Sequence, residues 1–338
     1  MNNLTDPAIL FFALGALAGL LRSNLEIPAP ISRFLSLYLL MALGLKGGFA
    51  LAQSGFTPQV VLTLLCAVLL AFLTPCIGFQ ILKRLTSQYN AAAIAATYGS
   101  VSAVTFITAV QYAETHAISY GGHMAAAMAL MESPAIILAV FLANRLRQPS
   151  SVQLLSTGGD VAAIEPGAPS SEHGKGSIAK ILHESFTDGA QLLLLGAILV
   201  GLVTGEAGKA AMKPFSGDLF KGMLCFFLLD MGLMAARNRP RTGTQSPWVL
   251  TYGILAPLVH AAIALGLASL LRLPSGDAGL LMTLAASASY IAVPAVLRYA
   301  IPEAQPSLYF GMALGITFPL NLLFGIPFYL ETARRALG

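Results

Sequence analysis

The chain has 338 residues, of which 56% are hydrophobic and only 10% carry a charge. A soluble domain has roughly 25% charged residues, so this composition excludes an ordinary soluble fold and predicts a membrane protein. The formal net charge of +4 comes from basic residues in loops between apolar segments, so nucleic-acid binding is not indicated.

Ten apolar segments follow one another along the chain. A helix needs about 20 residues to cross the bilayer, and all segments except the short first one reach that length. They cover residues 7–21, 31–51, 58–82, 91–113, 119–144, 185–204, 214–236, 248–271, 278–300 and 306–330. We therefore predict an all-α polytopic membrane protein with ten transmembrane helices.

Basic residues in the loops predict the orientation in the membrane. If the loops alternate between the two sides, twelve of the nineteen Lys and Arg residues gather on one side. These are Arg22, Arg33, Lys83, Arg84, Arg145, Arg147, Lys175, Lys180, Arg237, Arg239, Arg241 and Arg298. Because basic loops stay in the cytoplasm, both termini are predicted to lie outside. The polar, aromatic-free stretch 148–177 is predicted to be a cytoplasmic linker.

The two halves of the chain resemble each other in the same order along the sequence. Leu14-Gly15-Ala16 recurs as Leu195-Gly196-Ala197, Gly44-Leu45 as Gly232-Leu233, Ala96-Thr97 as Ala286-Ser287, and Pro134 as Pro319. Five segments in each half would make the second half enter the membrane from the opposite side, which is an inverted repeat. We expect residues 1–147 to form the first repeat, 148–177 the linker and 178–338 the second repeat. Chance similarity of apolar helices rich in Gly and Pro is the alternative.

The fourth and ninth segments each contain a cluster of small polar residues, at 97–102 and 287–290. Gly99 and Pro294 favour a helix break near each cluster. Because lipid cannot satisfy the freed backbone groups, each break is expected to line a cavity or to bind a ligand. Two helix N-termini at one centre would suit a small anion. The predicted substrate-binding residues are Tyr98, Gly99, Ser100, Val101, Ser102, Ala288, Ser289, Tyr290, Ile291 and Ala292.

The hydroxyl groups of the same clusters also suit an alkali cation such as Na⁺, because they are hard oxygen ligands. The predicted Na⁺-binding residues are Thr97, Ser102, Thr105, Ser287 and Glu132. Na⁺ is expected as a coupling ion, and no cofactor or other metal is expected. The alternative is that the small hydroxyl residues only bring helices close together.

Three charged residues lie inside apolar segments, where a charge is costly. Glu132 precedes Pro134 and is the candidate for a functional carboxylate. The long side chain of Lys46 is expected to reach the membrane surface, and Asp230 is given a structural role. Small-xxx-small pairs at Gly15 with Gly19 and at Gly201 with Gly205 predict close helix contacts.

Three other functions were weighed on the same residues. An intramembrane protease is disfavoured, since Asp230 lacks a Gly-x-Gly-Asp partner and residues 183–187 lack the His-x-x-x-His spacing of a zinc site. A proton-coupled carrier of a small organic anion, with Glu132 as proton carrier, stays open. A passive channel is disfavoured by the repeat and the broken helices.

Two stretches resemble the sodium-dependent bicarbonate transporter family of cyanobacteria, the SbtA type, and its bacterial homologues. They are Tyr98-Gly99-Ser100-Val101-Ser102 with Thr105, and residues 285–294 with Arg298-Tyr299-Ala300-Ile301-Pro302. The resemblance covers nearly the whole chain. Cyanobacterial members have Asp where this chain has Tyr290, which removes a Na⁺ ligand and alters the charge of the site.

The resemblance implies Na⁺-coupled uptake of bicarbonate across a bacterial plasma membrane by an elevator mechanism. Segments 3–5 and 8–10 would carry the substrate past a scaffold of segments 1, 2, 6 and 7. It also implies a homotrimer and a PII-like regulator on the cytoplasmic face.

Overall fold

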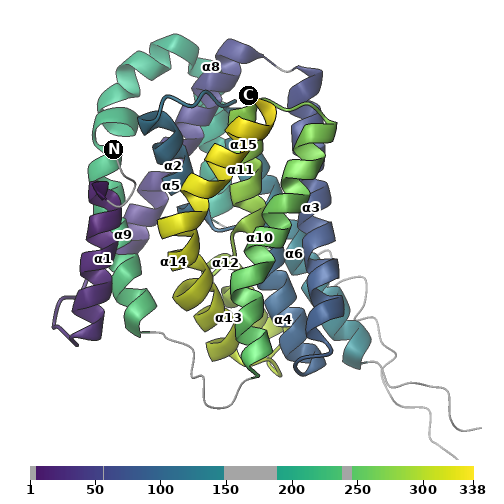
Figure 1. Ribbon diagram of the computed structural model, residues 1–338. Coiled ribbons are helices and arrows are strands. Elements are labelled where there is room, and N and C mark those ends of the chain that lie inside the picture. The colour runs from purple at the N-terminus through teal and green to yellow at the C-terminus, as the bar shows by residue number, and fades with distance from the viewer. Residues whose placement is uncertain (1–4, 56, 148–188, 238–245) are drawn as a thin grey trace, which may run out of the picture.

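A computed structural model describes residues 5–55, 57–147, 189–237 and 246–338 (Figure 1). Within these ranges every regular element is a helix, which confirms the all-α prediction for the described chain. Six helical stretches are long and apolar enough to cross a membrane: Ala29–Gln53, Pro58–Leu82, Gln88–Thr115, Gly189–Arg237, Pro247–Leu270 and Pro306–Leu337. The protein is therefore a helical membrane protein, while the predicted linker 148–177 lies outside the described residues.

The described part of the first half contains six helices, and four of them begin at a side-chain cap. They are α1 (Pro7–Leu20), α2 (Ala29–Ser54), α3 (Pro58–Leu82), α4 (Gln88–Gly99), α5 (Ala103–Thr115) and α6 (His123–Arg147). The side chains of Asp6, Thr57, Ser87 and Ser102 accept backbone N–H groups at the starts of α1, α3, α4 and α5. Such caps satisfy donors that a helix cannot pair internally.

The second half has the same sequence of long and broken helices. Its first members are α8 (Gly189–Lys213), the π-helical turn η2 (Pro214–Asp218), α9 (Phe220–Arg237), α10 (Pro247–Leu270), α11 (Ser275–Ala286) and α12 (Ala292–Ala300). The last stretch runs without interruption through α13 (Pro306–Met312), η4 (Ala313–Thr317), α14 (Phe318–Leu320), η5 (Asn321–Gly325) and α15 (Ile326–Leu337). Helix α8 bends at Gly205, which has a φ of 53°.

Glycine contacts hold α1 against α9 and α2 against α8. A Cβ atom on Gly15 would lie 2.0 Å from the carbonyl oxygen of Leu229, and one on Gly48 would lie 2.2 Å from that of Ile198. A Cβ atom on Gly201 would lie 2.6 Å from the carbonyl oxygen of Leu45 on α2, whereas Gly205 has no neighbour within 4 Å of such an atom. Backbones can approach this closely only where the residue is glycine, as predicted for Gly15 and Gly201.

The remaining helices pack on one another beside these two pairs. Helix α3 lies against α4 and α6, α10 lies against α11, and α11 lies against α15. Figure 1 shows α1 and α9 at one side of the bundle and α3 and α4 at the other. The chain thus forms a paired-helix group, α1, α2, α8 and α9, and a second group that contains α3–α6 and α10–α15.

Candidate functional site

The first break separates α4 from α5 within the predicted polar cluster. Ser100 is extended, and helix geometry resumes at Ala103 after Ser102. The Ser102 hydroxyl oxygen accepts the N–H of Thr105 at 3.2 Å, so this serine is the N-cap of α5.

The second break, at residues 287–291, is built in the same way and is tied to the first. The Ser289 hydroxyl oxygen accepts the N–H of Val293 at 3.3 Å near the start of α12. The N–H of Ser289 donates to the carbonyl of Thr97 at 2.8 Å, and the N–H of Ser102 donates to the hydroxyl of Ser287 at 2.9 Å. These two bonds join clusters almost 190 residues apart, so the predicted meeting of the two clusters is observed.

Asn321 supports the end of α11 from behind the second break. Its side chain is fully buried, and its amide donates to the carbonyl of Ala286 at 2.7 Å. The Tyr329 hydroxyl donates to the Asn321 carbonyl oxygen at 3.0 Å. Asn321 is not among the predicted site residues, although it is a lone Asn in the apolar tenth segment, which is a signal of a polar role.

A cavity of about 530 Å³ lies where both breaks face α2, α6 and α8. It is lined mostly by apolar side chains such as Leu37, Leu40, Val104 and Val296. Of the predicted site residues it includes Val101, Ser102, Ser289, Tyr290, Ile291, Ala292 and Glu132. It therefore lies between the two helix groups defined above.

The other predicted residues lie behind the cavity wall. The Tyr98 hydroxyl is within 2.6 Å of the Thr317 hydroxyl, and its ring packs edge-on against Tyr252. Gly99 lies against Pro75, because a Cβ atom there would be 2.5 Å from the proline ring. Ser100, Ala288, Thr97, Thr105 and Ser287 are buried and do not line the cavity. These residues can shape the breaks, and Thr97 and Ser287 also supply the bonds that join them.

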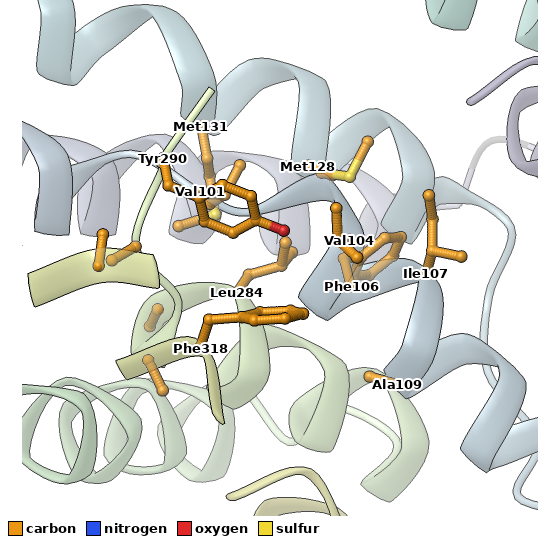
Figure 2. Packing of buried hydrophobic residues seen from close by; sticks show 14 of the residues in the cluster. Val101, Val104, Phe106, Ile107, Ala109, Met128, Met131, Leu284, Tyr290 and Phe318 are labelled. Carbon is orange, nitrogen blue, oxygen red and sulfur yellow. The ribbon is translucent and has the colours of Figure 1, made fainter. Parts of the chain in front are cut away.

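Tyr290 places a buried hydroxyl at the cavity. The residue is only 3% exposed, and Figure 2 shows its ring among Val101, Leu284 and Phe318. Its ring centroid is 5.3 Å from that of Phe318. The hydroxyl lies near the Ser102 side chain but has no hydrogen-bond partner of ordinary geometry among the described residues. A buried polar group without a partner is costly, so this hydroxyl is a candidate to bind a group that enters the cavity.

Ser102 and Ser289 present two further hydroxyl donors. Each oxygen accepts a backbone N–H, and the Ser102 hydroxyl also lies near the hydroxyl of Tyr290. With Tyr290, the cavity wall therefore carries three O–H groups that can donate to an incoming oxygen atom.

Charged and amide groups come from helices that the sequence analysis did not assign to the site. Arg33 on α2 and Gln191 on α8 line the cavity. The Gln191 amide donates to the Glu132 carboxylate at 2.8 Å, which links α8 to α6. The second intramembrane acid, Asp230, accepts a hydrogen bond from Ser32 within the paired-helix group, in agreement with a structural role.

Two interrupted helices that meet at a cavity between two helix groups are typical of membrane transport proteins. A family model described as the Na⁺-dependent bicarbonate transporter superfamily matches residues 7–334. The chain belongs to this superfamily, and it is a membrane transport protein rather than an enzyme. A search of curated proteins finds no significant match.

Proposed function

We propose that this protein uses the Na⁺ gradient to take up a small anion, with bicarbonate as the first candidate. The observation that carries the proposal is the set of three hydroxyl-bearing residues, Ser102, Ser289 and Tyr290, at one cavity where the two breaks meet. An oxyanion such as bicarbonate supplies negatively charged acceptor oxygens, so it is complementary to hydroxyl donors on this wall.

The charge of the bound anion favours coupling to Na⁺. The predicted Na⁺ ligands Thr97, Ser102, Thr105 and Ser287 surround the point where the breaks meet, and Glu132 lies on the cavity wall. A cation bound there would offset the anion's charge, which reduces the cost of carrying that charge through the membrane. Superfamily membership supports the same coupling ion.

The packing supports an inverted repeat of ten transmembrane helices. If the second half repeats the first, α1 corresponds to α8, α2 to α9, α3 to α10 and α4 to α11. Under this correspondence, the contact between α1 and α9 is equivalent to the contact between α8 and α2. The contact between α3 and α4 is likewise equivalent to that between α10 and α11, and all four contacts are present. In the proposal, the paired-helix group is the scaffold and the second group moves as the transport core of an elevator.

The proposed sidedness puts the cavity at the cytoplasmic end. Arg33 and the start of α8, which follows the linker, belong to the end that the basic loops assign to the cytoplasm. Both termini then lie outside a bacterial plasma membrane. The homotrimer and the PII-like regulator implied by the family resemblance stay predictions.

A carrier of a small organic anion is the second candidate, because a specific observation favours it. The cavity holds more than a bicarbonate ion requires, and its walls are largely apolar. An anion with a short hydrocarbon body would bury that body against Leu37, Leu40 and Val296. In this case Glu132 could carry a proton. Uptake that depends on Na⁺ at fixed pH would indicate Na⁺ coupling, and uptake that does not would indicate proton coupling.

Thermal unfolding of the purified protein tests joint binding of the two ions. We expect sodium bicarbonate to raise the unfolding temperature by about 2–4 °C more than the sum of the separate effects of potassium bicarbonate and sodium chloride. Each ion raises the affinity for the other, which is a coupling free energy. Strictly additive shifts at matched pH and ionic strength would contradict Na⁺-coupled anion binding.

Tyr290→Phe tests whether the buried hydroxyl is a ligand. We expect about tenfold weaker anion affinity, because a hydrogen bond to a charged group contributes about 1.5–3 kcal/mol. The measurement is the apparent affinity in uptake assays with correctly folded protein. Tyr252→Phe is the matched control, since its hydroxyl is also buried without a partner but lies off the cavity. Equal affinities in the two variants would show that the Tyr290 ring only packs.

A further inference from the structure

An ion pair connects the two helix groups away from the cavity. The Lys46 ammonium on α2 donates to both carboxylate oxygens of Glu114 on α5, at 3.0 and 2.9 Å. The Tyr120 hydroxyl donates to the same carboxylate at 3.0 Å. The side chains of Lys46 and Glu114 are 20% and 34% exposed. Lys46 therefore has a specific partner, which corrects the expectation that it only reaches the membrane surface.

The surroundings of this pair are tightly packed. The Lys46 ammonium lies 4.2 Å from the centre of the Phe220 ring on α9, a cation–π contact. The next residue, Gly47, meets Gly122 ahead of α6, where a Cβ atom on Gly122 would lie 2.3 Å from the Gly47 carbonyl oxygen. The ion pair and the glycine contact thus seal one end of the boundary between the groups.

The cavity lies toward the other end of the same boundary. Its α2 wall runs from Arg33 to Leu40, and α2 then closes on α8 at Gly44, where a Cβ atom would lie 2.7 Å from the Leu194 carbonyl oxygen. Lys46 is 13 residues beyond Arg33, which is about 20 Å along a helix. The Gln191 to Glu132 bond also joins the groups, but it lies in the cavity wall.

We propose that Lys46, Glu114 and the Gly47–Gly122 contact form the closed gate of the transport cycle in this state. The inference rests on the proposed elevator motion, in which the transport core slides past the scaffold. Opening the sealed end requires that Lys46 on the scaffold separate from Glu114 on the core. The pair therefore stabilises the state with the cavity open at the Arg33 end, and its loss shifts the population toward the opposite state.

Cysteine labelling measures this population without any transport assay. Ser36 lies on α2 in the cavity, so Ser36→Cys in a background with Cys66, Cys76 and Cys225 replaced by Ala reports access from the open end. We expect Lys46→Met and Glu114→Gln each to slow labelling by a membrane-impermeant maleimide about three- to fivefold, the effect of a partly exposed ion pair. The charge swap Lys46→Glu with Glu114→Lys is expected to restore most of the rate.

Lys209→Met is the matched control. Its ion pair with Glu206, at 3.5 Å, lies within α8 and crosses no boundary between the groups, so the labelling rate should not change. Unchanged labelling in both gate variants, with normal folding, overturns the gate whatever the transport assays show. Failure of the joint Na⁺ and bicarbonate binding test would overturn the proposed function, while slowed labelling in the gate variants would still support the gate.

Discussion

Replacement of both Ser102 and Ser289 by alanine is expected to lower anion affinity by about a hundredfold, and each single change by about tenfold. Each serine offers an O–H donor to the cavity, and a hydrogen bond to a charged acceptor contributes about 1.5–3 kcal/mol. Ser102 also caps α5, and Ser289 accepts the N–H of Val293 in the first turn of α12, so part of the loss arises from less ordered starts of these helices. The measurement is concentration-dependent uptake by purified protein in proteoliposomes.

Ser216→Ala is the control for this pair. Ser216 is buried, but its hydroxyl donates to the carbonyl of Met212 within the π-helical region and lies off the cavity. Its replacement should leave affinity within about twofold, since its local bond contributes little. If the double variant behaved like Ser216→Ala, the two breaks would not form one binding site.

Asn321→Leu is expected to give the largest loss of stability, about 2–4 kcal/mol. The change removes the amide donor and the carbonyl acceptor of the Asn321 side chain. The Ala286 carbonyl and the Tyr329 hydroxyl then lose these hydrogen bonds. Each unsatisfied buried group costs about 1–3 kcal/mol. Because Ala286 ends α11 beside the second break, we also expect weaker anion binding in the protein that folds. Denaturation of the purified variant in detergent measures the first effect.

Thr283→Val provides the comparison within α11. Thr283 is fully buried, but its hydroxyl donates to the Gly279 carbonyl of its own helix, which keeps its backbone partner when the hydroxyl is lost. The expected cost is below about 1 kcal/mol. Equal destabilisation by Thr283→Val and Asn321→Leu would show that the Asn321 network has no special role.

The sequence predicted the parts of the site that depend on local chemistry. Small polar residues and Gly99 inside apolar segments predicted helix breaks, and the serines at 102 and 289 are the residue type that caps the resumed helices. The repeat predicted that the two breaks meet. The direction of each side chain could not be predicted from the sequence. Tyr98 and Tyr290 belong to similar clusters, but Tyr98 contacts Thr317 while Tyr290 lines the cavity.

The residues that the sequence analysis missed are brought to the site by distant helices. Arg33 and Gln191 lie on α2 and α8, and nothing near them in the sequence marks them as part of a cavity. The same holds for Lys46 and Glu114, whose pairing depends on how α5 is placed against α2. Such contacts arise from tertiary packing, which local patterns do not encode.

Uptake of labelled bicarbonate by proteoliposomes at fixed pH tests the central claim most directly. With an inward Na⁺ gradient, we predict saturable uptake above the level of protein-free liposomes, and a K⁺ gradient of the same size should not support it. Equal uptake with the two gradients would contradict Na⁺-coupled bicarbonate transport.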